Sequence, residues 1–393
     1  MIFSTNNSPY PFNDPYLNKQ WHYYNDGSLK SSRYGADINV VPAWKNYKTG
    51  NPEIIISVVD EGIDFRHEDL IDNMWNNPSQ SFGDFKYGYN FVKKSYEIVP
   101  GSHGTHVAGI ISAVNNNSKG VSGIAGGDAA KGIPGVKLMS CQIFQGEEGA
   151  DGANAIKWGA DHGAVISQNS WGYIHGTIDY TPQYMKDAID YFNTYAGFDE
   201  NGIQTGPMAG GVVIFAAGND AVEISYPSEY EGCISVTAVG FDAKASYYTN
   251  FGAWSDIAAT GGDTYKDPMI LSTLPGNQYG YMQGTSMACP HVSGVAALII
   301  ANYGGKGFTN TMLKEKLLST TKEKYLYRHN STFSSEKSSL IFSKFGSSST
   351  HGIHQVAHRF MTTTFPFCSD NLKAFPSVQV MEKSLNSSPS AAP

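Results

Sequence analysis

The sequence has few charged residues and no strongly basic block. Only 16% of its 393 residues are Asp, Glu, Lys or Arg, and 27 basic against 35 acidic residues leave a net charge of -8. Nucleic-acid binding needs clustered Lys and Arg to neutralise phosphates. This sequence has no such cluster, so we expect no nucleic-acid partner. The longest apolar run, at 292–301, is much shorter than the roughly 20 residues that span a bilayer. We therefore expect no membrane span.

Cysteine is also scarce, and the amino terminus has no leader pattern. The start of the chain, MIFSTNNSPYPFNDP, has neither the basic nor the apolar region of a secretory signal. The four cysteines (Cys141, Cys233, Cys289 and Cys368) are widely spaced and form no CxxC pair. This spacing favours neither a zinc site nor a disulfide framework, so we expect buried free thiols.

Glycine is distributed unevenly along the chain. Residues 1–318 hold 40 of the 42 glycines, whereas 319–393 hold two glycines, 16 serines, and eight Lys and Arg against four Asp and Glu. The later segment also lacks apolar periodicity. We predict an amino-terminal extension at 1–13, one globular domain at 14–320, and a weakly structured, truncated or frameshifted tail at 321–393.

Within the domain, β-branched apolar runs alternate with helical patterns. The runs predict buried strands at 53–60, 136–144, 164–170, 211–219 and 233–240. The helices are expected at 103–114, 151–162, 182–195 and 286–302. This alternation predicts an α/β fold with a mainly parallel central sheet covered by helices on both faces. Ligands of such sheets bind at the carboxyl ends of the strands.

Three polar residues occur where chemistry is expected. Asp60 ends the first strand, His103 opens a helix in GSHGTHVAG, and Ser286 opens another in GTSMACPHVSG. Each alone has an ordinary explanation, as a turn aspartate, a capping histidine and an N-cap serine. Together a carboxylate, an imidazole and a hydroxyl are the parts of a nucleophilic relay.

The order Asp, His, Ser and the amino-acid sequence around each residue resemble those of the subtilisin-like serine peptidases, the subtilase family. An α/β-hydrolase would show the order Ser, acid, His and the motif GxSxG, which the residues around Ser286 do not match. The resemblance implies a subtilisin-like fold and a serine endopeptidase. In that family mechanism Ser286 attacks a peptide carbonyl, His103 transfers the proton and Asp60 orients the ring, with no cofactor for catalysis.

The resemblance also implies roles for residues outside the triad. Asn219, in FAAGND, matches the oxyanion-hole amide, although a turn asparagine is the ordinary alternative. The segment QNSWG matches the strand that pairs with an extended polypeptide substrate. The matching residues are Ser170, Trp171 and Gly172 for that strand, and Ala216, Ala217, Gly218 and Ser225 for the S1 pocket. These small neutral pocket residues predict tolerance of bulky apolar P1 side chains.

A calcium site is expected from a second resemblance. The segment Asn13-Asp-Pro-Tyr16 is similar to the amino terminus of the thermitase-like branch, where the matching Asp binds calcium. That likeness implies ligands from Asp14, Asp69, the Asn117 side chain, and the carbonyls of Val114, Lys119 and Val121. An all-oxygen set with two carboxylates suits Ca²⁺. The alternative is a solvated turn with Asp14 as a helix cap.

Other readings of the sequence have less support. A catalytically silent peptide-binding module with the same groove is the main rival, and a folding-defective product is a third possibility. His103 and His106 form HxxH without the glutamate of a zincin. The tail histidines His351, His354 and His358 are expected to be solvated. An extracytoplasmic location is expected from the family resemblance alone, and the oligomeric state stays open.

Overall fold

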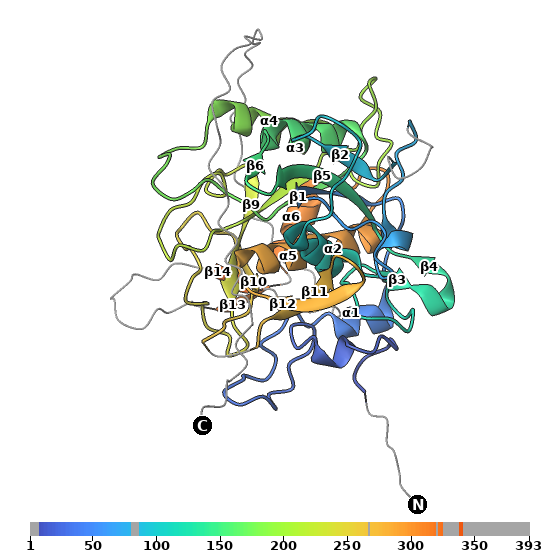
Figure 1. The fold of residues 1–393 in the computed structure, drawn as a ribbon, viewed down its shortest axis with the longest axis vertical. Coiled ribbons are helices and arrows are strands. Elements are labelled where there is room, and N and C mark those ends of the chain that lie inside the picture. The colour runs from blue at the N-terminus through green and yellow to red at the C-terminus, as the bar shows by residue number, and fades with distance from the viewer. Residues whose placement is uncertain (1–7, 80–85, 266–267, 320, 325–337, 341–393) are drawn as a thin grey trace, which may run out of the picture.

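The computed structural model describes residues 8–79, 86–265, 268–319, 321–324 and 338–340 (Figure 1). Their secondary structure follows the predicted alternation of strands and helices. The predicted strand and helix positions agree with the observed ones to within a few residues at most ends.

A single large sheet forms the centre of the fold. Its strands are β1 (Ile55–Glu61), β2 (Gly88–Asn90), β5 (Lys137–Gln145), β6 (Glu148–Gly149), β7 (Ile166–Asn169), β8 (Val212–Ala216), β9 (Cys233–Val239), β10 (Ile257–Thr260), β13 (Lys322–Lys324) and β14 (Ser338–Leu340). Ten strands join in the order β13-β14-β10-β9-β8-β7-β1-β5-β2, with β6 beside β5. From β14 to β2 all neighbours are parallel, and β13 and β6 are antiparallel. The predicted mainly parallel sheet is confirmed.

Strand β1 lies inside this sheet, between β5 and β7. Its interior residues, including Ile56, Val58 and Val59, are fully buried, as a continuous apolar run in a parallel sheet requires. Val59 pairs with Asn169 of β7, and Asp60 pairs with Gln142 of β5. Immediately after Asp60 the register with β5 shifts. The strand therefore changes its pairing at the residue that carries the carboxylate.

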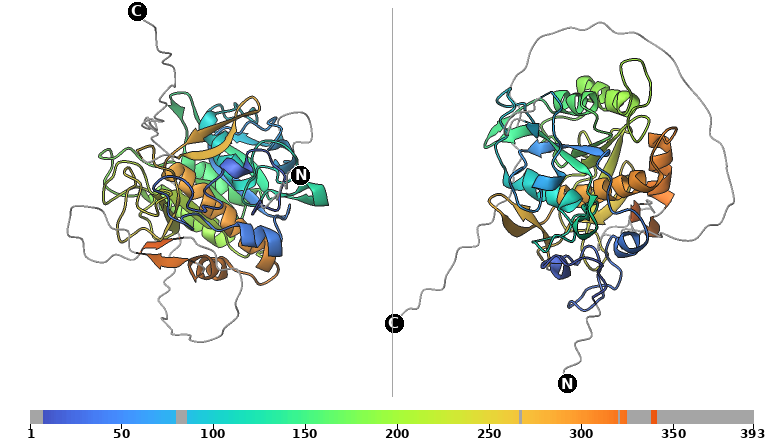
Figure 2. Two further views of the ribbon diagram at one scale, coloured as in Figure 1. Left: turned by 90° about the horizontal axis from the view of Figure 1, so that it is seen from below. Right: turned by 90° about the vertical axis from the view of Figure 1, so that its right-hand side faces the viewer.

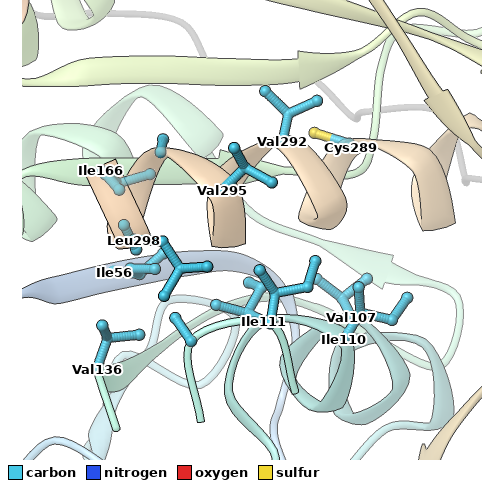
Figure 3. Close-up of a cluster of buried hydrophobic side chains, with 14 of the residues drawn as sticks. Ile56, Val107, Ile110, Ile111, Val136, Ile166, Cys289, Val292, Val295 and Leu298 are labelled. Carbon is cyan, nitrogen blue, oxygen red and sulfur yellow. The ribbon is translucent and has the colours of Figure 1, made fainter. Parts of the chain in front are cut away.

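Helices cover both faces of the sheet, as predicted (Figures 1 and 2). The helices α2 (Ser102–Ser112) and α5 (Thr285–Tyr303) lie on one face, and α3 (Gly152–Asp161) and α4 (Gln183–Tyr195) lie on the other. Figure 3 shows the first interface, where Ile56 and Ile166 of the sheet face side chains of α2 and α5. Burial of these large apolar groups fixes both helices against the sheet.

Helix α5 is apolar around its whole circumference. By length and composition alone it is the one helix among the described residues that could cross a membrane. In the fold 89% of that window is buried, and α5 packs on α2 and on strands from β7 to β10. A helix without a polar face is typical of a protein core. Its composition is therefore explained by its central position.

Several elements were not predicted from the sequence. They are the helices α1 (Val41–Asn46) and α6 (Asn310–Ser319), the 3-10 helices η1 (Leu17–Lys19), η2 (Ile71–Asn73) and η4 (Ala129–Lys131), the strand pairs β3–β4 (Gly127–Asp128, Ile133–Pro134) and β11–β12 (Ile270–Leu274, Gln278–Met282), and the sheet strands β2, β6, β10, β13 and β14. The β11–β12 hairpin packs on α2, where Ser272 and Thr273 donate hydrogen bonds to carbonyls of that helix. Strand β12 is partly exposed and polar, so its sequence carries no clear strand pattern.

Two short strands follow the predicted domain end at residue 320. Lys322–Lys324 and Ser338–Leu340 extend the sheet beyond β10. The rest of the predicted tail, with its four histidines and Cys368, lies outside the described residues. The domain boundaries therefore stay a prediction. Cys141, Cys233 and Cys289 are free and buried, as expected.

Candidate active site

The end of β1 and the start of α2 bring a carboxylate and an imidazole into contact. Asp60 is 1% exposed, and its Oδ1 lies 2.7 Å from Nδ1 of the half-buried His103. Because a carboxylate only accepts hydrogen bonds, Nδ1 carries the proton of the neutral ring. The other ring nitrogen, Nε2, is then the one that can accept a proton.

A second carboxylate holds the helix that carries this imidazole. Glu61 Oε2 accepts the backbone N–H of His103 at 2.8 Å, in the first turn of α2. A Cβ added at Gly104 would lie only 2.1 Å from the Glu61 carbonyl oxygen, so the glycine permits this close approach. Burial lowers the pKa of His103, but the charge and hydrogen bond of Asp60 and the charge of Glu61 raise it above its usual value.

Ser286 lies in the first turn of α5, next to the end of β7. Its hydroxyl donates to the Ser170 carbonyl at 3.1 Å. Since Asn169 pairs with Val59, Ser170 lies beside Asp60 at the same edge of the sheet. Within the described residues no hydrogen bond joins Ser286 to His103. The described residues thus show an Asp60–His103 pair and, near the same edge of the sheet, a serine whose hydroxyl donates to Ser170.

The side-chain nitrogen of Asn219 and the backbone nitrogen of Ser286 both lie close to Gly284. The Asn219 side-chain oxygen accepts hydrogen bonds from the N–H and the hydroxyl of Thr285, both at 2.9 Å, which directs its Nδ2 elsewhere. A Cβ added at Gly284 would lie 3.5 Å from Asn219 Nδ2 and 3.5 Å from the Ser286 nitrogen. Gly284 has φ +148°, which also disfavours a side chain. The Asn219 amide nitrogen and the Ser286 backbone nitrogen thus lie near each other, and a pair of N–H donors is the kind of group that can bind an oxyanion.

The predicted substrate strand continues from β7 and approaches Tyr226. Tyr173 N–H donates to the Tyr226 carbonyl at 2.8 Å, and a Cβ added at Gly172 would lie 3.0 Å from the same oxygen. Trp171 faces inward, since its ring lies 5.1 Å from that of Phe215. Only the backbone of Trp171, not its buried indole, is therefore suited to contact a substrate.

The predicted pocket residues lie together at and after the end of β8. Ala216 and Ala217 are buried, and Gly218 has φ +97°. A Cβ added at Gly218 would lie 2.3 Å from Asn250 Nδ2 and 3.0 Å from Ser225 Oγ. The glycine is thus required by its conformation and by its neighbours. Ser225 therefore lies close to Gly218.

The residues predicted to bind calcium also lie together. Asp14 and Asp69 are buried, and both accept hydrogen bonds from the loop at 114–121. Asn117 connects them, because its N–H donates to Asp14 at 3.0 Å and its Nδ2 donates to Asp69 at 2.7 Å. Lys119 donates its N–H to the Asn117 side chain, and its ammonium lies 4.0 Å from Glu68.

Burial disfavours the ionised form of both carboxyl groups in this cluster when no cation is bound. It raises the pKa of Asp69 to about 7, and the charge of Asp14 adds to that rise. Burial raises the pKa of Asp14 as well. Of the described residues, none donates a hydrogen bond to the carbonyls of Val114, Lys119 or Val121. Two carboxylates and three available carbonyls fit a hard cation such as Ca²⁺. No group of three or more His, Cys, Asp or Glu side chains with metal-site geometry occurs in the described part of the chain.

Three polar contacts of this site were not predicted from the sequence. Thr285 orients Asn219, Glu61 caps α2, and the buried Gln168 contacts Ser170. Gln168 belongs to the QNSWG segment, but its side-chain contacts are with Ser293 and Cys289 of α5, which the segment itself does not reveal. Cys289 is not a rival nucleophile, since burial raises the pKa of its thiol to about 12.

The amino-acid sequence is similar to known peptidases over most of its length. The model of the Subtilase family matches residues 51–352. A thermophilic serine proteinase of Bacillus sp. (strain AK1) is 33% identical over 70% of this chain and 59% of its own length. Thermitase of Thermoactinomyces vulgaris is 30% identical over 70% of this chain and 84% of its own length. The chain thus spans little more than half of the Bacillus relative.

Solved structures show the same fold. The serine protease of Aeromonas sobria matches with a TM-score of 0.64 at 20% identity, over 80% of this chain and 58% of that one. A protease from Pseudoalteromonas arctica matches with a TM-score of 0.60 at 25% identity, over 79% of this chain and 92% of that one. The family match, which covers the Asp60, His103 and Ser286 motifs, confirms the resemblance seen in the sequence. This chain belongs to the subtilase family.

Proposed function

We propose that this chain is a serine endopeptidase that hydrolyses peptide bonds through an Asp60–His103–Ser286 triad. The observation that carries the proposal is the 2.7 Å contact between Asp60 and His103 at the sheet edge where Ser286 begins α5. The family match and the proteinases among the relatives support the same reaction.

In the proposed reaction Ser286 Oγ forms a bond to the carbonyl carbon of the substrate. His103 Nε2 takes the hydroxyl proton, and Asp60 stabilises the imidazolium that results. The tetrahedral oxyanion lies between Asn219 Nδ2 and the Ser286 N–H. When the C–N bond breaks, the imidazolium gives its proton to the leaving amine. Water, deprotonated by His103, then releases the acyl group and restores the serine.

The proposed substrates are extended polypeptides. Their backbone would pair with the edge at Ser170–Gly172, which lies next to Ser286. The pocket formed by Ala216, Ala217, Gly218 and Ser225 carries no charge, which favours bulky apolar P1 residues over acidic or basic ones. Cleavage-site profiling with a peptide library tests this preference. A dominant Arg, Lys, Asp or Glu at P1 would contradict it.

The rival is a peptide-binding module with the same groove but no catalysis. A fluorophosphonate probe separates the two proposals because it reacts only with an activated serine. We expect covalent labelling of the wild-type chain and none of Ser286→Ala, together with peptide cleavage by the wild type alone. A folded wild-type chain that binds peptides but is neither labelled nor active would support the rival.

We also propose that the Asp14 and Asp69 cluster binds a structural Ca²⁺. The two carboxylates and the carbonyls of Val114, Lys119 and Val121 would hold it, and the Asn117 side chain would join them by turning its amide so that Oδ1 replaces Nδ2 beside Asp69. The raised pKa of Asp69 supports this assignment, because a bound cation would stabilise the ionised form that burial disfavours. Calorimetric titration of calcium into the chelator-treated chain tests it. Equal heats for wild type and Asp69→Asn would reject the site.

A further inference from the structure

A proline in α5 leaves the carbonyl of the proposed nucleophile without its helical partner. Pro290 is four residues after Ser286 and has no N–H to donate to that carbonyl. The missing donor is replaced from outside the helix, because Ser170 Oγ donates to the Ser286 carbonyl at 2.8 Å. The position of Ser286 therefore depends on where the Ser170 hydroxyl points.

The direction of the Ser170 hydroxyl is set by a buried glutamine. A serine hydroxyl has one proton, and Ser170 gives it to Ser286, so toward its other neighbour it can only accept. That neighbour is Gln168, whose Nε2 lies 2.8 Å from Ser170 Oγ. Gln168 lies in β7 and is fully buried, so no water competes for its amide.

The other end of the Gln168 amide is held by α5 itself. Its Oε1 accepts a short hydrogen bond from the Ser293 hydroxyl and a longer one, at 3.4 Å, from the Cys289 thiol. Both donors are fully buried. Because the Ser170 hydroxyl proton is already directed at the Ser286 carbonyl, the amide nitrogen must face Ser170, and its oxygen then faces Ser293 and Cys289. The chain of bonds runs from Ser293 through Gln168 and Ser170 to Ser286.

We propose that Gln168 is a positioning residue for Ser286. It fixes the Ser170 hydroxyl on the carbonyl that Pro290 leaves unpaired, and so holds the first turn of α5 against the end of β7. This inference rests on the proposed peptidase function. Gln168 touches neither the substrate nor the reacting atoms, and it acts through Ser170.

The end of β7 and the first turn of α5 carry different parts of the proposed reaction. The end of β7 would hold the substrate backbone at Ser170–Gly172, and the first turn of α5 carries the nucleophile and the Ser286 N–H donor. Their relative position sets the distance from Ser286 Oγ to the scissile carbonyl. Small errors in that distance cost much rate, whereas substrate binding to the strand edge is little affected. The loss should therefore appear in kcat rather than in KM.

The first test replaces the amide and keeps the side-chain length. We expect Gln168→Met to lower kcat about ten- to a hundred-fold and to change KM by less than about two-fold. The matched control is Gln204→Met, because Gln204 makes three hydrogen bonds near the far end of α5, to Gly206, Gly305 and Gly307. The control should lower thermal stability without lowering kcat. Equal kcat values for both variants and the wild type would overturn the inference.

The second test restores the bonds by protonation. A neutral carboxyl in Gln168→Glu can donate to Ser170 and accept from Ser293, whereas its ionised form can only accept. The kcat of this variant relative to wild type should therefore be highest at low pH and fall as the introduced carboxyl ionises. A ratio that does not change with pH would count against the proposed direction of the bonds. Gln168→Met should show no such dependence.

Serine labelling separates the two possible failures, and Ser293→Ala provides a milder variant if Gln168→Met does not fold. If the wild type is not labelled by a fluorophosphonate, the proposed function itself is wrong. If the wild type is labelled and Gln168→Met or folded Ser293→Ala reacts equally fast, only the positioning role is wrong. The inference predicts slower labelling of both variants, with a smaller loss for Ser293→Ala.

Discussion

Two buried clusters of this molecule differ in the partners that their carboxylates contact. At the sheet edge, Asp60 contacts the imidazole of His103 at 2.7 Å, and its charge raises the pKa of that imidazole. In the loop cluster, Asp14 and Asp69 contact only N–H and hydroxyl groups among the described residues. Burial raises the pKa of both carboxyls there.

The difference indicates different roles. In the Asp60–His103 pair the imidazole becomes a counter-charge to the carboxylate when it takes up a proton, so the pair can store and return that proton without any added ion. In the loop cluster of Asp14 and Asp69, either protonation or a bound cation would offset the free energy of burying two carboxylates. Removing groups from the first cluster should therefore reduce rate, and removing groups or calcium from the second should reduce stability.

The largest expected effect is that of removing the imidazole. His103→Ala should lower kcat on the order of a million-fold, because Ser286 then has no base. The thermal midpoint should also fall, because the His103 side chain is only 13% exposed and its loss leaves the buried Asp60 carboxylate without this partner. Steady-state kinetics on a peptide substrate and thermal unfolding of the same preparation check both parts. Activity within a hundred-fold of the wild type would mean that another group serves as base.

The next effect concerns the oxyanion donors. Asn219→Ala should lower kcat on the order of a hundred- to a thousand-fold with KM nearly unchanged, because the lost bond forms only as negative charge develops. Thr285→Val should show part of this loss, since Thr285 orients Asn219 through its hydroxyl. The comparison of kcat with KM for both variants is the measurement. An effect confined to KM would place Asn219 in ground-state binding instead.

A stability effect should follow from calcium and pH in the second cluster. In the calcium-free chain Asp69 has a pKa of about 7, raised from 3.8, so within that range the folded state binds more protons than the unfolded state. Stability from this group then falls as pH rises through the window. Calcium binds the ionised form, so the gain in melting temperature on adding calcium should grow from acidic to neutral pH.

The same experiment needs an inactive background and a matched variant. Ser286→Ala prevents self-digestion, and Asp69→Asn in that background should lose most of the calcium-dependent gain. Melting curves with calcium and with chelator at several pH values check this. A calcium gain that is the same in Asp69→Asn would place the ion elsewhere.

The smallest expected effect is a shift in the pH profile. Glu61→Gln keeps an oxygen to accept the His103 N–H but removes a charge that raises the pKa of the imidazole. The acidic limb of kcat/KM should therefore move to lower pH, with little change in the plateau. The asparagine variant of Asp69 should leave this limb in place. An unchanged limb in Glu61→Gln would show that the Glu61 charge does not reach the imidazole.

The parts of this protein that sequence predicts well are those encoded locally. A buried strand such as 53–60 and an apolar helix such as 286–302 each have their own periodicity, and the structure gives Ile55–Glu61 and Thr285–Tyr303. The positions of Asp60, His103 and Ser286 follow from strand ends and helix starts. The contact between Asp60 and His103 lies where β1 ends, at the edge where ligands of parallel sheets bind.

The contacts that tune the site could not be predicted in this way. Thr285 reaches Asn219 across 66 positions of sequence, and Ser293 reaches Gln168 across 125. Such partners are set by how α5 packs on the sheet, and no local pattern contains that information. The β11–β12 hairpin was missed for a similar reason, because its contact with α2 holds residues whose own pattern is mixed.

The central claim is that the imidazole oriented by Asp60 activates Ser286, and the pH dependence of fluorophosphonate labelling tests it most directly. The account predicts labelling at Ser286 at a rate that rises through one ionisation with a midpoint above 6.5, the usual pKa of a histidine. In His103→Ala that rise should be absent and labelling should be nearly lost. Labelling at another residue, or a rate at Ser286 that does not depend on pH or on His103, would contradict it.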